Sequence, residues 1–186
     1  MMTIRHSLSP YLKSVKFWLL LLLITLGIFT LEKAKKDPFL PATHIKNKNS
    51  TFQVVIWTET EKPYYKAGEN IVLFVKATAN CYLLLFNINS EGNGLLIFPN
   101  QHQQENYLTQ NTLYRIPPLG YQYCLKATGS GKELIKAIAT KREIKWSFGL
   151  WKRKEFFNTL KTLERKLKAQ TSGDWTEAEV WVQIKK

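Results

Sequence analysis

Short apolar runs separated by turn-forming residues fill the middle of the chain, from residue 52 to residue 140. The turn sequences include SEGNG at residues 90–94 and GSG at residues 129–131. Runs with such boundaries predict β-strands, and several at this spacing predict a sandwich of antiparallel sheets. The expected strands are 52–57, 70–77, 81–87, 94–98, 113–116, 121–126 and 133–140. We expect an immunoglobulin-like sandwich, with a partly open barrel as the alternative.

The strand expected at residues 70–77 is apolar on both of its faces. Ile71, Leu73 and Val75 alternate with Val72 and Phe74. A strand with one solvated face would alternate apolar and polar residues. This strand is therefore expected to be central and covered on both sides.

After residue 140 the hydrophobic period changes from that of a strand to that of a helix. Phe156, Leu160, Leu163 and Leu167 recur at spacings of four, three and four, which predicts an amphipathic helix within residues 151–170. The sequence TSGD at residues 171–174 ends this helix, and residues 175–184 alternate as a last strand. Residues 51–186 are therefore expected to form one β-sandwich domain with a C-terminal amphipathic helix.

Near the N-terminus, residues 17–31 (FWLLLLLITLGIFTL) form an uncharged run of 15 residues. The run is short for a membrane span, which usually needs about 17–25 residues, and it fits a signal peptide. The sequence EKAKK that follows offers no small-residue cleavage site. We therefore expect an uncleaved transmembrane signal anchor at 17–31, after a cytoplasmic tail at 1–16, with a cleaved signal peptide as the alternative. Residues 32–50 are expected to be a polar linker to the domain.

The net charge of +13 lies at the two ends of the chain. Residues 1–50 carry 8 Lys/Arg against 2 Asp/Glu, residues 51–140 carry 7 against 6, and residues 141–186 carry 12 against 6. The β-rich middle is nearly neutral, which argues against a nucleic-acid-binding face on the sheet.

The chain has two cysteines, Cys81 and Cys124, each within an expected strand. Outside the cytoplasm they could form a disulfide. The alternative is two separate thiols, because pairing requires Cα atoms within about 7 Å.

The predicted helix concentrates positive charge beside its apolar stripe, and three interpretations are open. Its stripe can enter anionic lipid, or it can dock on the sheet and leave the charges solvated; the charge alone would also suit nucleic acid. A neutral sheet and an anchor weigh against nucleic acid. The candidate lipid or partner surface comprises Lys152, Arg153, Lys154, Lys161, Arg165, Lys166 and Lys168.

No catalytic, metal or cofactor constellation is evident in the sequence. The histidines are His6, His44 and His102, and they do not form a metal-ligand cluster. The sequence GSGK at residues 129–132 lacks the full phosphate-loop pattern. We expect no enzyme activity, no cofactor and no metal. The alternative is an envelope hydrolase or transferase built on loops, with Glu69, Glu105 or His102 in one cleft.

The order of motifs between residues 57 and 100 resembles the bacterial domain-of-unknown-function family numbered 4384. The matching elements are YYKAGE at residues 64–69, the Tyr-containing strand that ends in Asn at 81–87, the glycine turn, and FPN at 98–100. The resemblance implies an envelope-associated accessory domain that closes with a helix and a Trp-containing strand. It also favours an anchor with the N-terminus inside and the domain in the periplasm.

These observations lead to an expected function. The chain is expected to be a single-pass protein of the bacterial inner membrane, whose periplasmic domain is a non-enzymatic binding or scaffolding module. Its partner would be another envelope protein or a cell-wall component. Besides the enzyme, the alternative is a cytoplasm-facing basic module that binds anionic lipid or nucleic acid.

Overall fold

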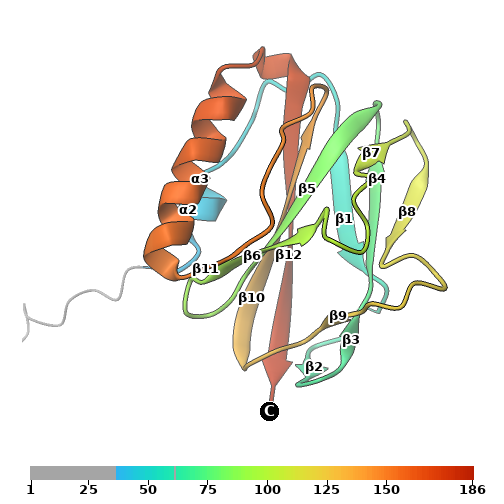
Figure 1. The fold of residues 1–186 in the computed structure, drawn as a ribbon, viewed down its shortest axis with the longest axis vertical. Coiled ribbons are helices and arrows are strands. Elements are labelled where there is room, and N and C mark those ends of the chain that lie inside the picture. The colour runs from blue at the N-terminus through green and yellow to red at the C-terminus, as the bar shows by residue number, and fades with distance from the viewer. Residues whose placement is uncertain (1–36, 61) are drawn as a thin grey trace, which may run out of the picture. The chain divides into compact units, whose positions relative to one another are not determined.

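Two facing β-sheets and one long helix form three layers (Figure 1). The computed structural model describes residues 37–60 and 62–186, and Pro38–Lys186 is one compact unit. The prediction of a mainly β fold with antiparallel sheets and a C-terminal helix is confirmed. The elements are α2 (Leu40–Thr43), β1 (Val54–Thr58), β2 (Tyr65–Lys66), β3 (Asn70–Ile71), β4 (Leu73–Ala77), β5 (Cys81–Ile88), β6 (Gly94–Phe98), β7 (Tyr107–Leu108), β8 (Leu113–Ile116), β9 (Leu125–Lys126), β10 (Gly131–Thr140), β11 (Leu150–Trp151), α3 (Arg153–Lys168), η1 (Ser172–Asp174) and β12 (Trp175–Lys185).

The large sheet has the strand order β11-β6-β5-β10-β12-β2, and β7 also pairs with β5. All of its pairings are antiparallel except that of β12 with β2. Successive residues of a strand point to opposite faces. Leu83 and Leu85 of β5 therefore enter one core, while Leu84 and Phe86 enter a second core on the other face. The central strands of this sheet are covered on both sides.

The inner core lies between the large sheet and a three-stranded sheet of order β1-β4-β8. Leu73 and Val75 of β4 are fully buried in it. The opposite face of β4 is only partly covered: the ring of Phe74 lies 5.9 Å from that of Trp57, and Lys76 is exposed. The strand is central in its sheet, as predicted, but the prediction that both of its faces are covered is wrong. The strand that has this property is β5.

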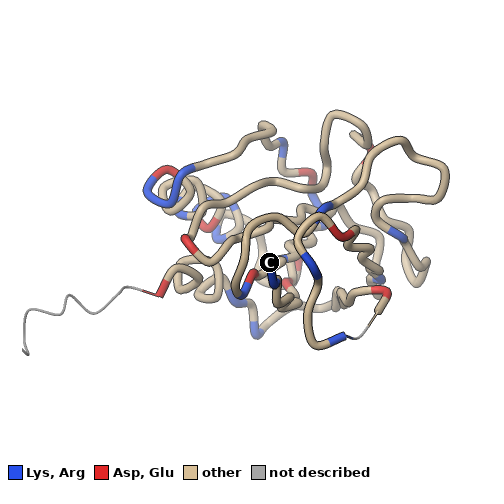
Figure 2. Tube along the Cα trace, turned by 90° about the horizontal axis from the view of Figure 1, so that it is seen from below, with Lys and Arg blue, Asp and Glu red and all other residues tan. Residues whose placement is uncertain are grey.

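The outer core lies between the other face of the large sheet and α3 (Figure 1). The buried residues of α3 are Phe156, Leu160, Leu163 and Leu167, the four residues of the predicted stripe. Seen from below, α3 lies at one side of the domain and carries Lys and Arg positions along its trace (Figure 2). The helix therefore docks its stripe on the sheet.

Residues 38–50, expected to belong to a polar linker, instead pack on the outer face of the large sheet. Ala42 of α2 and Ile45 are buried in the outer core. Lys136 of β10 is fully buried, and its Nζ donates to the Ile45 carbonyl at 2.8 Å. The same Nζ lies 2.6 Å from Glu177 Oε2 and 2.8 Å from Glu179 Oε1. This ion cluster ties the segment to two strands, so the folded unit begins at Pro38 rather than at residue 51.

The expected anchor at residues 17–31 and the tail before it lie outside the described residues. Within residues 37–60 and 62–186, no helix is long and apolar enough to cross a membrane.

The expected strand at 121–126 is reduced to β9, which pairs only with β3. Tyr121 is half exposed, and Tyr123 packs against His102. Both aromatics therefore lie on a long connection between β8 and β9 and not in a sheet. The short strands β2, β7 and β11 and the helix α2 lack a sequence signal of their own.

Candidate binding groove beside the long helix

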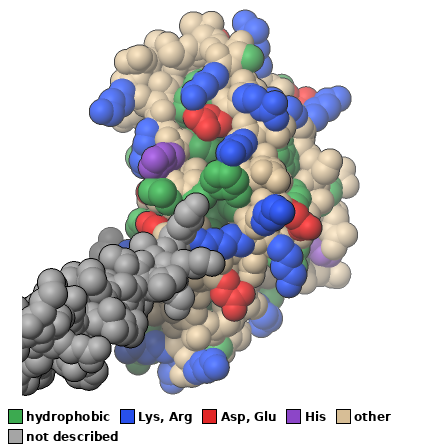
Figure 3. Space-filling model, turned by 90° about the vertical axis from the view of Figure 1, so that its left-hand side faces the viewer, with side chains coloured by type: hydrophobic (Ala, Val, Ile, Leu, Met, Phe, Trp, Pro, Cys, Tyr) green, Lys and Arg blue, Asp and Glu red, His purple; other side chains and the backbone are tan. Residues whose placement is uncertain are grey.

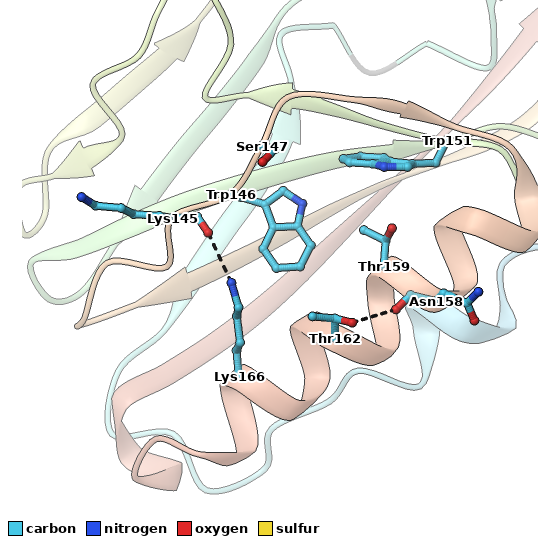
Figure 4. A pocket seen from close by; sticks show the side chains of 8 residues that line it. All are labelled: Lys145, Trp146, Ser147, Trp151, Asn158, Thr159, Thr162 and Lys166. Carbon is cyan, nitrogen blue, oxygen red and sulfur yellow. Dashed lines mark hydrogen bonds between the residues drawn. The ribbon is translucent and has the colours of Figure 1, made fainter.

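A groove of about 400 Å³ runs between α3 and the segment that connects β10 to it (Figure 4). The sequence of residues 145–151, KWSFGLW, supplies one wall, and the exposed side of α3 supplies the other. The lining residues are Lys145, Trp146, Ser147, Trp151, Asn158, Thr159, Thr162 and Lys166. The volume falls within the range of ligand sites, which is about 300–1,000 Å³.

The two tryptophan rings of the groove are held from behind by phenylalanines of the outer core. Trp146 meets Phe86 edge-on, with ring centroids 6.3 Å apart. Trp151 stacks on Phe156, with centroids 5.9 Å apart and an interplanar angle of 27°. Both Trp side chains are half-buried, so each ring keeps surface open to solvent. The rings are therefore preorganised platforms.

Polar groups of α3 face the tryptophans across the groove. Thr159 points from α3 toward Trp151 in Figure 4, and Thr162 Oγ1 donates to the Asn158 carbonyl at 3.1 Å. Lys166 Nζ lies 4.8 Å from the centroid of the Trp146 ring and 3.4 Å from the Lys145 carbonyl oxygen. An aromatic face attracts a cation at this distance. The groove thus offers two aromatic faces, an amide, hydroxyls and ammonium groups.

The face around the groove is strongly basic. Residues 152–168 hold seven Lys/Arg against two acids, Glu155 and Glu164, a net charge of +5. The face of the molecule on the α3 side carries Lys and Arg side chains spread among hydrophobic ones (Figure 3). One ion pair, between Lys168 and Glu164 at 2.7 Å, offsets part of this charge. Such a field attracts anions over a Debye length of about 10 Å.

The seven predicted surface cations lie on or directly before α3, but their roles differ. Lys166 lines the groove, and Lys161 lies 4.3 Å over the Phe157 ring. The backbone N of Arg153 donates to Asn93 Oδ1 at 3.0 Å, at the turn before β6. The interpretation in which the stripe enters lipid is overturned, because the stripe is buried against the sheet.

Sequence reasoning missed the other half of the groove. Lys145, Trp146 and Trp151 come from a connection without helical or strand period. The available signal was composition, since WSFGLW holds three aromatics in six residues.

The structure keeps Cys81 and Cys124 apart, as free thiols. Cys81 is buried at the start of β5, opposite Leu108, and burial raises the pKa of its thiol to about 11. Cys124 is exposed and lines a hollow with Asn87, near the other end of β5. Six residues of strand separate Cys81 from Asn87, about 20 Å, well beyond the reach of a disulfide.

The residues of the hydrolase alternative each have separate local partners. Glu69 pairs with Lys62 and accepts from the backbone N of Lys66 at 2.9 Å, and these hydrogen bonds lower the pKa of Glu69. Glu69 therefore fixes the turn between β2 and β3. The His102 ring stacks on Tyr123, with centroids 5.3 Å apart.

Glu105 Oε1 accepts from the backbone N of Tyr107 at 3.2 Å. Among the described residues, no hydrogen bond or ion pair joins any two of Glu69, His102 and Glu105. Nor does the described part of the chain contain a group of three or more His, Cys, Asp or Glu that could hold a metal.

Comparison with known proteins yields a family and no closer relative. No curated protein and no solved structure matches the chain. The matched segment runs from the strand before the Ala67-Gly68-Glu69 turn to the start of the connection that follows β10. It includes the three central strands β4, β5 and β10 and leaves out α3 and the groove. Over residues 64–143 the chain matches the family described as Domain of unknown function (DUF4384), as the sequence resemblance predicts.

Proposed function

We propose that this protein is a non-enzymatic binding module that holds an anionic polysaccharide of the cell envelope along α3. The observation that carries the proposal is the groove in which Trp146 and Trp151 stand opposite Thr159 and Lys166, with Asn158 also in its lining. It lies within a helix face of net charge +5.

The chemistry of the groove suits an acidic sugar better than an acidic peptide. Aromatic rings pack on the apolar CH faces of sugar rings while their polar edges remain wet. Hydroxyl and amide groups, here Thr159 and Asn158, form the hydrogen bonds that orient a sugar. Lys145 and Lys166 supply charge for a carboxylate or phosphate on the polymer. A purely electrostatic site would not need two anchored tryptophans.

The proposed setting is the periplasmic side of the bacterial inner membrane, with residues 17–31 as a single-pass signal anchor. The uncharged run and the family resemblance support this setting. An alkaline phosphatase fusion after Lys186 tests it in live cells: an active, full-length fusion supports the proposal. An inactive fusion contradicts it and favours the cytoplasmic alternative.

We further propose that the fold is an immunoglobulin-like sandwich. In that fold the strands of one sheet follow the order A-B-E, and those of the other add C′ to C-F-G. If β1, β4, β5, β6, β8, β10 and β12 are taken as A, B, C, C′, E, F and G, the observed orders β1-β4-β8 and β6-β5-β10-β12 correspond. This assignment supports the proposal.

The binding proposal is tested by calorimetric titration of the full-length chain with four polymers. An alginate oligosaccharide is the acidic sugar, dextran the neutral sugar, polyglutamate the acidic peptide and a single-stranded oligonucleotide the nucleic acid. We expect alginate to bind most tightly, with an affinity that falls as salt rises. Equal binding of alginate, polyglutamate and oligonucleotide would show that the site recognises negative charge and not a sugar. Tightest binding of the oligonucleotide would favour the cytoplasmic alternative.

Two matched pairs of variants locate the site. Trp146→Ala removes a Trp ring of the groove, and Trp181→Ala removes an exposed Trp outside the groove. Lys166→Ala removes a groove cation and Lys76→Ala an exposed one on the small sheet. Only the first member of each pair should weaken alginate binding. Equal loss in both members of a pair would contradict the assignment.

A further inference from the structure

A second hollow, of about 220 Å³, lies on the inner face of the large sheet, the face opposite to that of the groove. Strands β5, β6 and β10 line one side of the hollow. Residues 124–128, which include β9, line the other side, and β9 is held by its pairing with β3. Ile71, Leu95, Ile97, Leu125 and Ile135 give it apolar walls.

One carboxyl group lies in this apolar hollow. Glu133 of β10 is only 4% exposed, and its Oε2 accepts a hydrogen bond from Asn87 Nδ2 at 2.8 Å. Burial raises the pKa of Glu133, although the bond from Asn87 acts in the opposite direction. Glu133 belongs to none of the ion pairs of the described residues. A buried charge without a counter-ion is costly, so a cationic ligand would be stabilised here.

The charged and titratable neighbours of Glu133 in the hollow are Cys124 and Lys126. Lys126 lines the hollow, but its Nζ lies 3.3 Å from the Gly68 carbonyl and 3.4 Å from Asn70 Oδ1, so its charge is directed at the turn before β3. Within the part of the chain that the structure describes, no Lys or Arg therefore pairs with the Glu133 carboxyl that faces the hollow.

We propose that this hollow binds a small primary alkylammonium, with the ammonium on Glu133 and the alkyl chain between the isoleucine and leucine walls. A single polar group in an apolar pocket fixes the orientation of such a ligand. The ammonium has three donors, and it bonds to the Glu133 carboxylate while Asn87 keeps its own bond to Oε2. This site is independent of the polysaccharide groove, because the two lie on opposite faces of the large sheet.

Ligand-detected NMR on the full-length chain tests the site with three probes of one shape: n-pentylammonium, 1-pentanol and pentanoate. We expect pentylammonium to bind about tenfold or more tightly than pentanol, since the charge-assisted bond is absent from the alcohol. Pentanoate should not bind. In Glu133→Gln, pentylammonium should fall to the affinity of pentanol, and Glu143→Gln, a variant of an exposed acid, should behave as wild type. Equal affinities for ammonium and alcohol in the wild type would overturn the proposal.

One chemical modification and one further variant test where the ligand lies. N-ethylmaleimide attaches to the exposed Cys124 and not to the buried Cys81, so modification at the mouth of the hollow should abolish pentylammonium binding. Undiminished binding after modification would overturn the location. Lys126→Met should bind at least as tightly as wild type. Binding seen only in Lys126→Met would mean that the chain's own lysine occupies the carboxyl, and the proposal would fall.

Discussion

The two faces of the large sheet are built from the same strands but are covered by different kinds of contact. On the inner face, β10 presents Ile135, Ala137 and Ala139, which close against the small sheet in an apolar core. On the outer face the same strand presents Lys136, held by two glutamates and the backbone of the N-terminal segment. The inner face thus excludes polar groups except at its end, around Glu133, whereas the outer face includes them.

This difference shows where the molecule can adapt to a partner. An apolar core between two sheets specifies their packing and leaves little surface for recognition. The helix side is held by a narrow stripe, so a groove remains between α3 and the WSFGLW segment. The helix side is therefore where we place polysaccharide binding, and the following changes separate the two faces.

The largest effect is expected from the buried ion cluster of the outer face. Lys136→Ala leaves Glu177 and Glu179 without their buried cation, and should lower the free energy of unfolding by about 3–5 kcal/mol. Chemical denaturation measures this change. Lys136→Met combined with Glu177→Leu and Glu179→Leu should recover much of the loss. A loss of less than about 1 kcal/mol in Lys136→Ala would contradict the proposed role of the cluster.

A comparable stability loss in each core should have unequal effects on binding. Leu163 of α3 and Leu85 of β5 are both fully buried, one in each core. Either change to Ala should cost about 2–5 kcal/mol, which thermal unfolding measures. Where both variants remain folded, Leu163→Ala should also weaken alginate binding because it loosens α3. Equal binding losses in the two variants would show that the groove does not depend on the outer core.

A smaller effect is expected from the groove itself. Trp146→Ala should lower the affinity for alginate about tenfold, or about 1.4 kcal/mol, because truncating a central aromatic commonly costs this much. Trp181→Ala serves as the control, and calorimetry measures both. Unchanged affinity for alginate in Trp146→Ala would show that the Trp146 ring does not contact the polymer.

The smallest expected effect compares two acids: at pH 7, replacing Glu133 should raise the free energy of unfolding, whereas replacing Glu179 should lower it. The folded-state pKa of Glu133 is raised by burial, so its ionisation opposes folding above that pKa, and the cost disappears as pH falls below the unfolded value. Glu133→Gln should therefore raise the free energy of unfolding by about 1 kcal/mol at pH 7 and by progressively less as pH falls. Urea unfolding at several pH values measures the difference, and a constant difference would contradict it.

Glu179 on the outer face should behave in the opposite way. Burial raises the pKa of Glu179, but Lys136 and Lys46 outweigh that effect and hold the pKa below its ordinary value. Its stabilising contribution is complete above the unfolded pKa and is lost as pH falls through the folded pKa. In the same urea series, Glu179→Gln should therefore be less stable than wild type at pH 7, with a gap that narrows in acid.

The regular elements of the fold could be predicted because their residues carry a period. The stripe from Phe156 to Leu167 and the strands β5 and β10 were evident as patterns of apolar residues. The coverage of β4 was predicted wrongly, because an apolar Phe74 can also pack on a surface Trp57. Periodicity indicates which side chains are apolar, but not which layer covers them.

The groove and the docked N-terminal segment could not be predicted, because tertiary contacts create both. Residues 38–50 have a polar composition, yet Ile45 meets Lys136 across 91 residues of chain. Trp146 and Lys166 likewise meet only after α3 folds back over the sheet. Of the seven predicted surface cations, the sequence could not distinguish Lys166 as the one that lines the groove.

The most direct test of the central claim, that binding occurs on the helix side, is amide hydrogen exchange of the full-length chain with and without the alginate oligosaccharide. We predict slowed exchange in residues 144–168, which contain the WSFGLW segment and α3, and unchanged exchange in β4 and β8 of the small sheet. Protection of β4 and β8 with none at 144–168 would contradict the account and move the binding surface to the opposite side of the domain.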